Sequence, residues 1–216
     1  MSELWKQSAI DVVGLLRSGE ISPVEAVQAA IKRIEAVDSK TNALPIRCFD
    51  RAIERAQTLD LTGHRQNPKS LCGLPIAVKD YNDVAGVRTT YGSPIFKDHI
   101  AERSDVTVAV LEHNGANPIA KSNVSEWAGG HTFNPVNGLT CNPWNLSRSA
   151  GGSSGGSAAA LASGQVWLAT GNDLGGSLRT PAAFNAVVGL RPSPGVVPRG
   201  HGNLTFDTLW VEGPMG

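Results

Sequence analysis

The chain has 216 residues, of which 41% are hydrophobic and 18% charged, a composition that excludes a disordered protein and suffices for one sizeable domain. Its 19 basic and 19 acidic residues balance, so neither nucleic acid nor a membrane surface is an expected partner. Three cysteines lack metal-ligand spacing, and neither a signal peptide nor a transmembrane-length stretch is visible. These features predict a cytoplasmic protein without a metal or another cofactor.

The first 70 residues are predicted to be mainly helical. Ser8 can cap a helix that ends at Gly19, and Ser22 and Glu25 form a capping box with a proline in the first turn. Further along, the pattern predicts an extended stretch at Asn42–Phe49, a helix at Arg51–Leu59 and a polar connection at Thr62–Ser70.

From Leu71 onward, short apolar runs alternate with turn residues. Leu74–Val78 is predicted to be a buried strand that carries Lys79 and Asp80 at its end. A helix is expected at Asp105–Glu112, and further strands at Pro118–Ala120 and Gln165–Ala169. Strands that alternate with helices favour an α/β fold with a mixed sheet. We expect a single domain, with a helical N-terminal region at 1–70 and a segment at 71–216 that carries the candidate chemistry.

Lys79 has two interpretations at the end of an apolar strand. Most lysines in such a place extend their amine to water. A fully buried amine instead loses its proton more easily, because burial disfavours the charged form, and it then becomes a usable base.

A stretch of small residues from Gly151 to Ala183 contains two glycine-flanked serines, Ser153 and Ser177. The loop around Ser153 could bind phosphate, but it lacks the Gly-Lys-Ser/Thr ending of a P-loop and the spacing of a dinucleotide motif. The glycines before Ser177 permit a turn that either caps the next helix or directs several N–H groups at one point. No histidine lies in a small-residue motif, so a serine hydrolase would need a lysine that acts through a second serine.

Three motifs of the chain resemble those of the amidase signature family of serine hydrolases. They are GLPIAVKD at Gly73–Asp80, GGSSGGSAAALASG at Gly151–Gly164 and GNDLGGSLRTPAAF at Gly171–Phe184, and GLRPSPGVVPR at Gly189–Arg199 resembles a fourth. The resemblance covers nearly the whole chain. It implies a mixed β-sheet surrounded by helices and the hydrolysis of a carboxylic amide to an acid and ammonia or an amine.

The resemblance also implies a Ser-Ser-Lys triad, in which Ser177 is the nucleophile, Ser153 relays a proton and Lys79 is the base. In the family the relay serine follows a cis peptide bond, here Gly152–Ser153. The oxyanion hole would consist of the backbone N–H groups of Leu174, Gly175, Gly176 and Ser177. Supporting roles would fall to Ser154, Asp173 and Arg179, and substrate contacts to Trp127 and Ala128. A scattered tryptophan is, however, more often a core residue.

The chain departs from the family pattern at several positions and in length. Asn172 stands where serine is usual, and Leu174 stands where threonine is common. Family members are longer, which implies that a C-terminal half is absent and that a second chain carrying it is an expected partner. The other expected partners are a small amide substrate and a second copy of the chain in a homodimer.

Two other functions stay open at this stage. The chain could resemble the glutamine-hydrolysing subunit of a tRNA-dependent amidotransferase, although it lacks a tyrosine after Pro192-Ser193 and a basic surface signal. It could also be a truncated, inactive protein that only binds other chains, although its motifs are intact.

Overall fold

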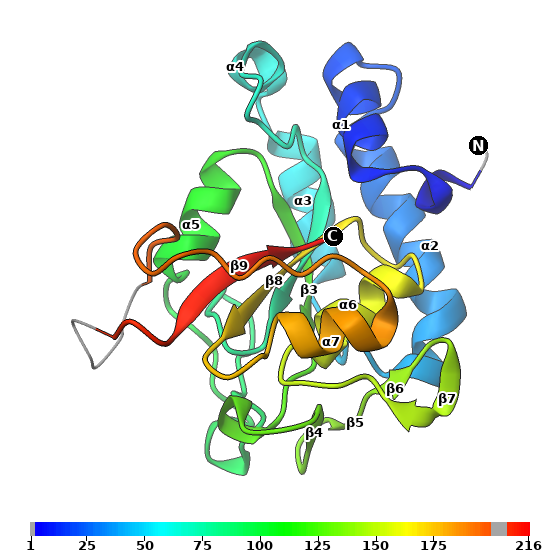
Figure 1. Cartoon of the computed structure of the whole chain (residues 1–216). Coiled ribbons are helices and arrows are strands. Elements are labelled where there is room, and N and C mark those ends of the chain that lie inside the picture. The colour runs from blue at the N-terminus through cyan, green and yellow to red at the C-terminus, as the bar shows by residue number, and fades with distance from the viewer. Residues whose placement is uncertain (1–2, 200–206) are drawn as a thin grey trace.

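The computed structural model describes residues 3–199 and 207–216, and its centre is a five-stranded sheet in the order β1-β3-β2-β8-β9 (Figure 1). These strands are β1 (Ile46–Arg47), β2 (Pro75–Lys79), β3 (Asn117–Ser122), β8 (Leu168–Asp173) and β9 (Val211–Met215). β2 runs parallel to β3 and β8, whereas β1 and β9 pair antiparallel at the two edges. The predicted α/β fold with a mixed sheet is therefore confirmed.

Helices and two short strand pairs surround this sheet (Figure 1). The α-helices are α1 (Ala9–Ser18), α2 (Pro23–Thr41), α3 (Phe49–Thr58), α4 (Leu61–Gln66), α5 (Val106–His113), α6 (Gly155–Ala162) and α7 (Arg179–Asn185). Single 3-10 turns are η1 (Leu4–Lys6), η2 (Pro94–Phe96) and η3 (Glu126–Ala128). The strand pairs are β4 (Phe133–Asn134) with β5 (Gly138–Leu139) and β6 (Cys141–Asn142) with β7 (Asn145–Ser149).

The predicted caps of the first two long helices are confirmed. The Ser8 hydroxyl accepts the Asp11 N–H at 3.2 Å, and Gly19 ends α1 in the left-handed region with φ of 82°. Ser22 and Glu25 make both hydrogen bonds of the capping box at the start of α2. These caps satisfy backbone N–H groups that the first turn of a helix leaves without partners.

The prediction of a polar connection at residues 62–70 is wrong in its first half, where α4 forms. The Asp60 carboxylate accepts the Thr62 N–H at 2.9 Å and so caps this short helix. No residue of α4 is buried. The helix therefore has no apolar stripe by which its sequence could have been recognised.

β8 lies later in the chain than the predicted strand at residues 165–169. It begins at Leu168 and ends at Asp173, because residues 169–173 pair with β9 over its whole length. This long-range pairing extends the strand through Asn172 and Asp173, beyond its predicted end at Ala169. Both side chains thereby acquire fixed positions beside the loop that carries Ser177.

Side chains alternate between the two faces of β2, and this alternation places Lys79. Ile76 and Val78 join a cluster with Val108 of α5, while Ala77 joins the larger cluster beneath α2 and α6. Lys79 is two residues beyond Ala77, so it follows Ala77 onto the α6 face. The start of α6 is where Ser153 and Ser154 lie.

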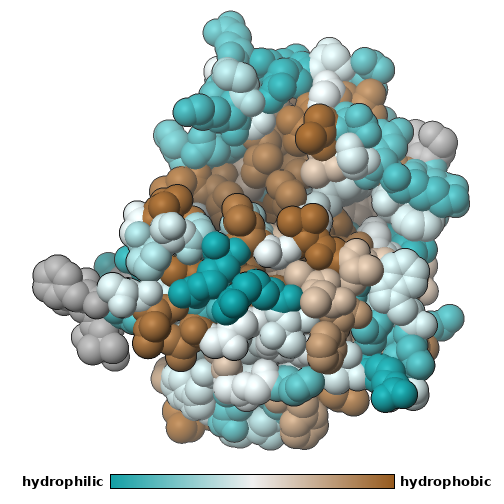
Figure 2. Space-filling model, in the orientation of Figure 1, coloured by the Kyte–Doolittle hydropathy of each residue, from teal (hydrophilic) through white to brown (hydrophobic). Residues whose placement is uncertain are grey.

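The α5 face of the sheet contains a cavity of about 330 Å³. Apolar residues gather on the side of the molecule that Figure 2 presents, in the region of β9 and α5. The cavity is lined largely by apolar side chains, among them Ile76, Val110, Leu111, Leu168, Val196 and Pro214. None of Lys79, Ser153 and Ser177 lines it.

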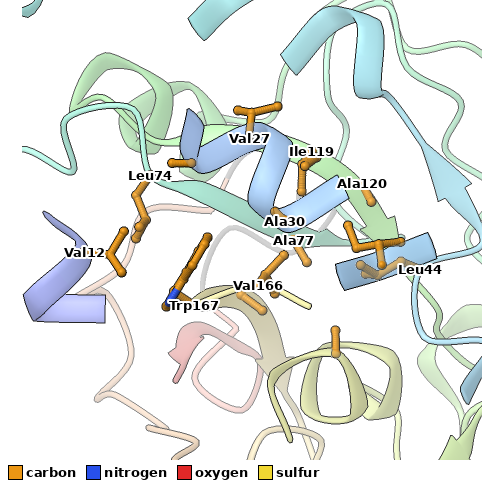
Figure 3. Packing of buried hydrophobic residues seen from close by; sticks show 14 of the residues in the cluster. Val12, Val27, Ala30, Leu44, Leu74, Ala77, Ile119, Ala120, Val166 and Trp167 are labelled. Carbon is orange, nitrogen blue, oxygen red and sulfur yellow. The ribbon is translucent and has the colours of Figure 1, made fainter. Parts of the chain in front are cut away.

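The larger core cluster packs α1 and α2 against the sheet and α6 (Figure 3). Val12, Val27 and Ile119 are fully buried there, and Trp167 is 8% exposed. Each such side chain stabilises the fold by about 1.5–3 kcal/mol relative to its exposed state. The small residues of α6 let the helix approach closely, since a Cβ on Gly156 would lie 2.3 Å from the Asn123 backbone nitrogen.

Candidate active site

Lys79 is the last residue of β2, and its side chain is fully buried. The interpretation that this amine extends to water is therefore wrong. Its Nζ lies 2.7 Å from Ser153 Oγ, 2.8 Å from Ser154 Oγ and 2.5 Å from Asn172 Oδ1. A neutral amine donates two hydrogen bonds and accepts one. Of these three partners, only the two serine hydroxyls can donate a hydrogen bond to Nζ, because the Asn172 oxygen is an acceptor. The cluster therefore accommodates either protonation state, with one serine hydroxyl donating when the amine is neutral.

Burial changes the acidity of this lysine. Removal from water disfavours the ammonium form and lowers the pKa of Lys79 to about 7, although the carboxylates of Glu212 and Asp173 act in the opposite direction. The same burial raises the pKa of Glu212. Near neutral pH, Lys79 thus exists as a mixture of amine and ammonium, as suits a group that both takes and returns a proton.

The loop before α6 holds Ser153 and Ser154 against Lys79. The peptide bond between Gly152 and Ser153 is cis, as the family resemblance implied. Thr132 fastens the loop, because its hydroxyl donates to the Ser153 carbonyl at 3.3 Å and accepts the Gly155 N–H at 2.9 Å. Both serines are buried. Their hydroxyls are therefore fixed contacts of the lysine.

Ser177 lies on the next loop, between β8 and α7. The Ser154 N–H donates to the Ser177 carbonyl at 3.3 Å, which joins the two serine loops. Ser177 is half-buried, and its hydroxyl makes no hydrogen bond within residues 3–199 and 207–216. The structure thus brings Lys79 and Ser153 into contact, whereas no hydrogen bond joins Ser153 to Ser177.

The four backbone N–H groups of the predicted oxyanion hole differ in their partners. The Gly176 N–H donates to Asp173 Oδ1 at 2.7 Å and is therefore occupied. No acceptor in the described part of the chain binds the backbone N–H groups of Leu174, Gly175 and Ser177. Leu174 and Gly175 are exposed. Three of the four donors are consequently open to an incoming oxygen in this structure.

Asp173 braces the Ser177 loop from the end of β8. Its carboxylate accepts Arg179 Nε at 2.9 Å, the Leu178 N–H at 3.2 Å and Arg191 Nη1 at 3.3 Å. Burial raises the pKa of Asp173, but the hydrogen bonds from Arg179 and from the Gly176 and Leu178 N–H groups outweigh it and lower the pKa to about 2. Asp173 and Arg179, to which the family resemblance gave supporting roles, thus contact each other beside Ser177.

A second buried lysine lies on the neighbouring strand β3 and was not predicted. Lys121 of β3 contacts Asp80 at 3.0 Å and Thr89 Oγ at 2.7 Å, and both charged side chains are fully buried. Asp80 also accepts the N–H and hydroxyl of Thr90. The signal for this ion pair was a lysine that directly follows the apolar run Pro118–Ala120.

Trp127 and Ala128, the predicted substrate contacts, form η3. Trp127 is 46% exposed, so it is not a core residue, and it stacks on Tyr91 with ring centroids 5.8 Å apart. Both residues have positive φ, at 51° and 60°. Their loop abuts the relay loop, since a Cβ on Gly152 would lie 2.2 Å from the Gly130 carbonyl oxygen. Within the described residues, no hydrogen bond joins either side chain to Lys79, Ser153 or Ser177.

Neither a metal-binding cluster nor a membrane-spanning helix occurs in residues 3–199 and 207–216. This part of the chain contains no group of three or more His, Cys, Asp or Glu side chains placed to hold a metal ion. None of its helices combines the length and the apolar character needed to cross a membrane.

The model of the amidase family matches residues 25–216. The chain is 41% identical over 206 residues to a glutamyl-tRNA(Gln) amidotransferase subunit of Carboxydothermus hydrogenoformans, covering 94% of this chain and 42% of that protein. It is 38% identical over 220 residues to indoleacetamide hydrolase of Bradyrhizobium diazoefficiens, covering 98% of this chain and 42% of that protein. A solved bacterial aryl acylamidase of the amidase signature family has a TM-score of 0.88 and 34% identity, covering 97% of this chain and 44% of that one. The chain spans less than half the length of the relatives it matches.

Proposed function

The chain belongs to the amidase signature family, and we propose that it hydrolyses a carboxylic amide to the acid and ammonia or an amine. The observation that carries this proposal is the contact of the fully buried Lys79 with Ser153, next to a loop that leaves the Ser177 hydroxyl without a partner among the described residues. A lysine with a lowered pKa, a hydroxyl beside it and an accessible second hydroxyl are the parts that acyl transfer without histidine requires.

In the proposed first step, the Ser177 oxygen attacks the amide carbonyl carbon and forms a tetrahedral intermediate. The Ser177 proton passes to Ser153, whose own proton passes to the neutral Nζ of Lys79. The negative oxygen accepts hydrogen bonds from the open N–H groups of the Ser177 loop, each worth about 3–4 kcal/mol in the transition state. The intermediate then collapses, and the C–N bond breaks as the relayed proton returns to the leaving nitrogen.

In the proposed second step, water attacks the ester that links the acyl group to Ser177. Lys79 again takes a proton through Ser153, the C–O bond of the ester breaks, and the proton returns to Ser177. Both steps begin with Lys79 as a neutral amine. Since its pKa is about 7, a substantial fraction of the lysine is neutral at physiological pH.

Covalent labelling of Ser177 by a fluorophosphonate tests the proposal without knowledge of the natural amide. We expect the wild-type protein to gain one label at Ser177, as located by mass spectrometry of its peptides, and to hydrolyse at least one simple amide. Ser177→Ala should lose the label and at least about 10⁴-fold in turnover. Ser147→Ala, an exposed serine on β7, is the control and should behave as wild type. Undiminished labelling of Ser177→Ala would exclude the assignment.

The identity of 41% to an amidotransferase subunit supports a second candidate, release of ammonia from glutamine in a multisubunit enzyme. This candidate uses the same serines and lysine, so active-site variants do not separate the two. Glutaminase activity that appears only with partner subunits would favour it. Hydrolysis of simple amides by the chain in the absence of such subunits would favour the first.

We further propose that additional polypeptide, in the same protein or in a second chain, completes the substrate pocket. The chain's span of 42% of the relative's length supports this proposal. Intact mass and size-exclusion chromatography of the native protein test it. A species with the mass of this chain alone that is fully active would contradict it.

A further inference from the structure

Lys79 has a carboxylate neighbour that its hydrogen bonds do not reveal. Glu212 lies on β9, directly opposite Asn172 of β8 in the antiparallel register. Opposed residues of antiparallel strands project to the same face of the sheet. Asn172 contacts Lys79 Nζ at 2.5 Å, so Glu212 is the cross-strand neighbour of a residue that touches the lysine amine.

Glu212 is also held close to the turn that follows Lys79. The Asn82 side-chain amide donates to Glu212 Oε2 at 3.4 Å, and the Asn82 N–H donates to the Lys79 carbonyl at 2.9 Å. The Trp210 indole N–H fixes the other carboxylate oxygen at 2.9 Å. The glutamate is only 5% exposed. Its charge therefore acts on Lys79 through a medium from which most water is excluded.

The other carboxylates near Lys79 are compensated by closer cations. Asp80 pairs with Lys121 at 3.0 Å, and Asp173 is paired with Arg179 at 2.9 Å and with Arg191. Glu212 pairs with neither a lysine nor an arginine: in the described part of the chain, no cation lies within ion-pair distance of its carboxylate. Arg199, whose charge lowers the pKa of Glu212, is itself paired with Asp207 at 3.1 Å. Glu212 is thus the least compensated carboxylate facing the lysine.

We propose that Glu212 is a positioning residue of this site, whose carboxylate stabilises the ammonium form of Lys79 that each proton transfer creates. The proposal rests on the amide hydrolysis proposed above, in which Lys79 accepts the proton of Ser177 through Ser153. An ammonium forms there at a point without access to water, and a nearby anion lowers the cost of its formation. The direction in which Glu212 shifts the pKa of Lys79, upward, agrees with this role.

Glu212→Gln tests the proposal, because glutamine keeps the size of the side chain and an oxygen for Trp210 while removing the charge. The pKa of Lys79 is measured directly, by NMR titration of protein labelled with ¹³C at the lysine ε-carbons, with Lys79→Arg to assign the signal. We expect this pKa to fall by about one pH unit in Glu212→Gln. The pH at which fluorophosphonate labelling of Ser177 is half-maximal should fall by the same amount.

Two controls separate the charge of Glu212 from the fold. Asp98→Asn removes a charge from an exposed side chain and should leave both values at those of wild type. Glu212→Asp keeps the charge but withdraws it by one methylene, so the pKa of Lys79 should fall by a smaller amount. If Glu212→Gln does not fold, an unchanged pKa in Glu212→Asp overturns the proposal.

An unchanged pKa of Lys79 in a folded Glu212→Gln variant also overturns it, whatever the activity. Failure of the proposed hydrolysis would look different. Ser177 would then resist labelling at every pH in the wild-type protein, while the NMR titration would still report whether Glu212 acts on Lys79.

Discussion

The two serine loops of this molecule meet, yet they are built in opposite ways. The relay loop before α6 is buried. The Ser153 hydroxyl accepts a hydrogen bond from Lys79, and the Ser153 carbonyl accepts one from Thr132. The loop that carries Ser177 begins at Leu174, which is 51% exposed, and leaves N–H groups and a hydroxyl without acceptors or donors among the described residues. In the proposed reaction, the first loop handles only protons, and the second must admit a substrate.

This difference indicates where rigidity is needed and where it is not. The proton path between Ser153 and Lys79 is the same for every amide, so its geometry can be completed in advance. In the proposed reaction, the Ser177 hydroxyl and the N–H groups of its loop contact a reacting carbonyl. These groups must therefore have no hydrogen-bond partner before the substrate binds. Variants that affect one loop and spare the other test whether the two loops differ in this way.

Among the variants that compare the two loops, the largest effect is expected at Lys79, the buried end of the proton path. Lys79→Met keeps the volume of the side chain and removes the base, so turnover should fall by about 10³-fold or more. In the wild type, activity should rise with pH through about 7, because the amine loses its proton above its pKa. The residual activity of Lys79→Met should instead increase steadily toward high pH, where hydroxide replaces the lysine. A wild-type pH profile in the variant would exclude Lys79 as the base.

An intermediate effect is expected from a matched pair of glycines, one in each loop. A Cβ on Gly152 would lie 2.2 Å from the Gly130 carbonyl oxygen, whereas a Cβ on Gly175 would meet nothing within 4 Å. Gly152→Ala should therefore lower the free energy of unfolding by about 1–3 kcal/mol or more, and Gly175→Ala should leave it within about 0.5 kcal/mol of wild type. Urea denaturation monitored by tryptophan fluorescence measures both. Equal losses would show that the two loops do not differ in packing.

A smaller effect is expected from Asp173, which braces the Ser177 loop. Asp173→Asn should lower the free energy of unfolding at pH 7 by on the order of 1–2 kcal/mol, because the ion pairs with Arg179 and Arg191 are lost. Asp173 titrates near pH 2 in the folded protein, below the ordinary value of 3.8 for an aspartate. Its contribution is therefore fully present above pH 3.8 and is lost as the pH falls toward 2. The difference between wild type and variant should shrink over that range, and a difference independent of pH would contradict the assignment.

Local patterns determined much of what the sequence could predict. Ser8, Gly19 and Ser22 marked helix ends through hydrogen bonds to residues only a few positions away, and these predictions were confirmed. The apolar run before Lys79 likewise predicted β2. The family motifs pointed to Lys79, Ser153, Ser177 and their neighbours, because each motif is continuous in the chain.

Only the tertiary structure decided which of these residues meet. It buried Lys79 completely, added Asn172 to its contacts and set Glu212 opposite Asn172, across a strand pairing that no local pattern encodes. It also engaged the Gly176 N–H with Asp173 and left the Ser177 hydroxyl apart from Ser153. The physical reason is that caps and short apolar runs depend on neighbours in the chain. Burial, charge and strand register depend on residues brought together from positions dozens of residues apart.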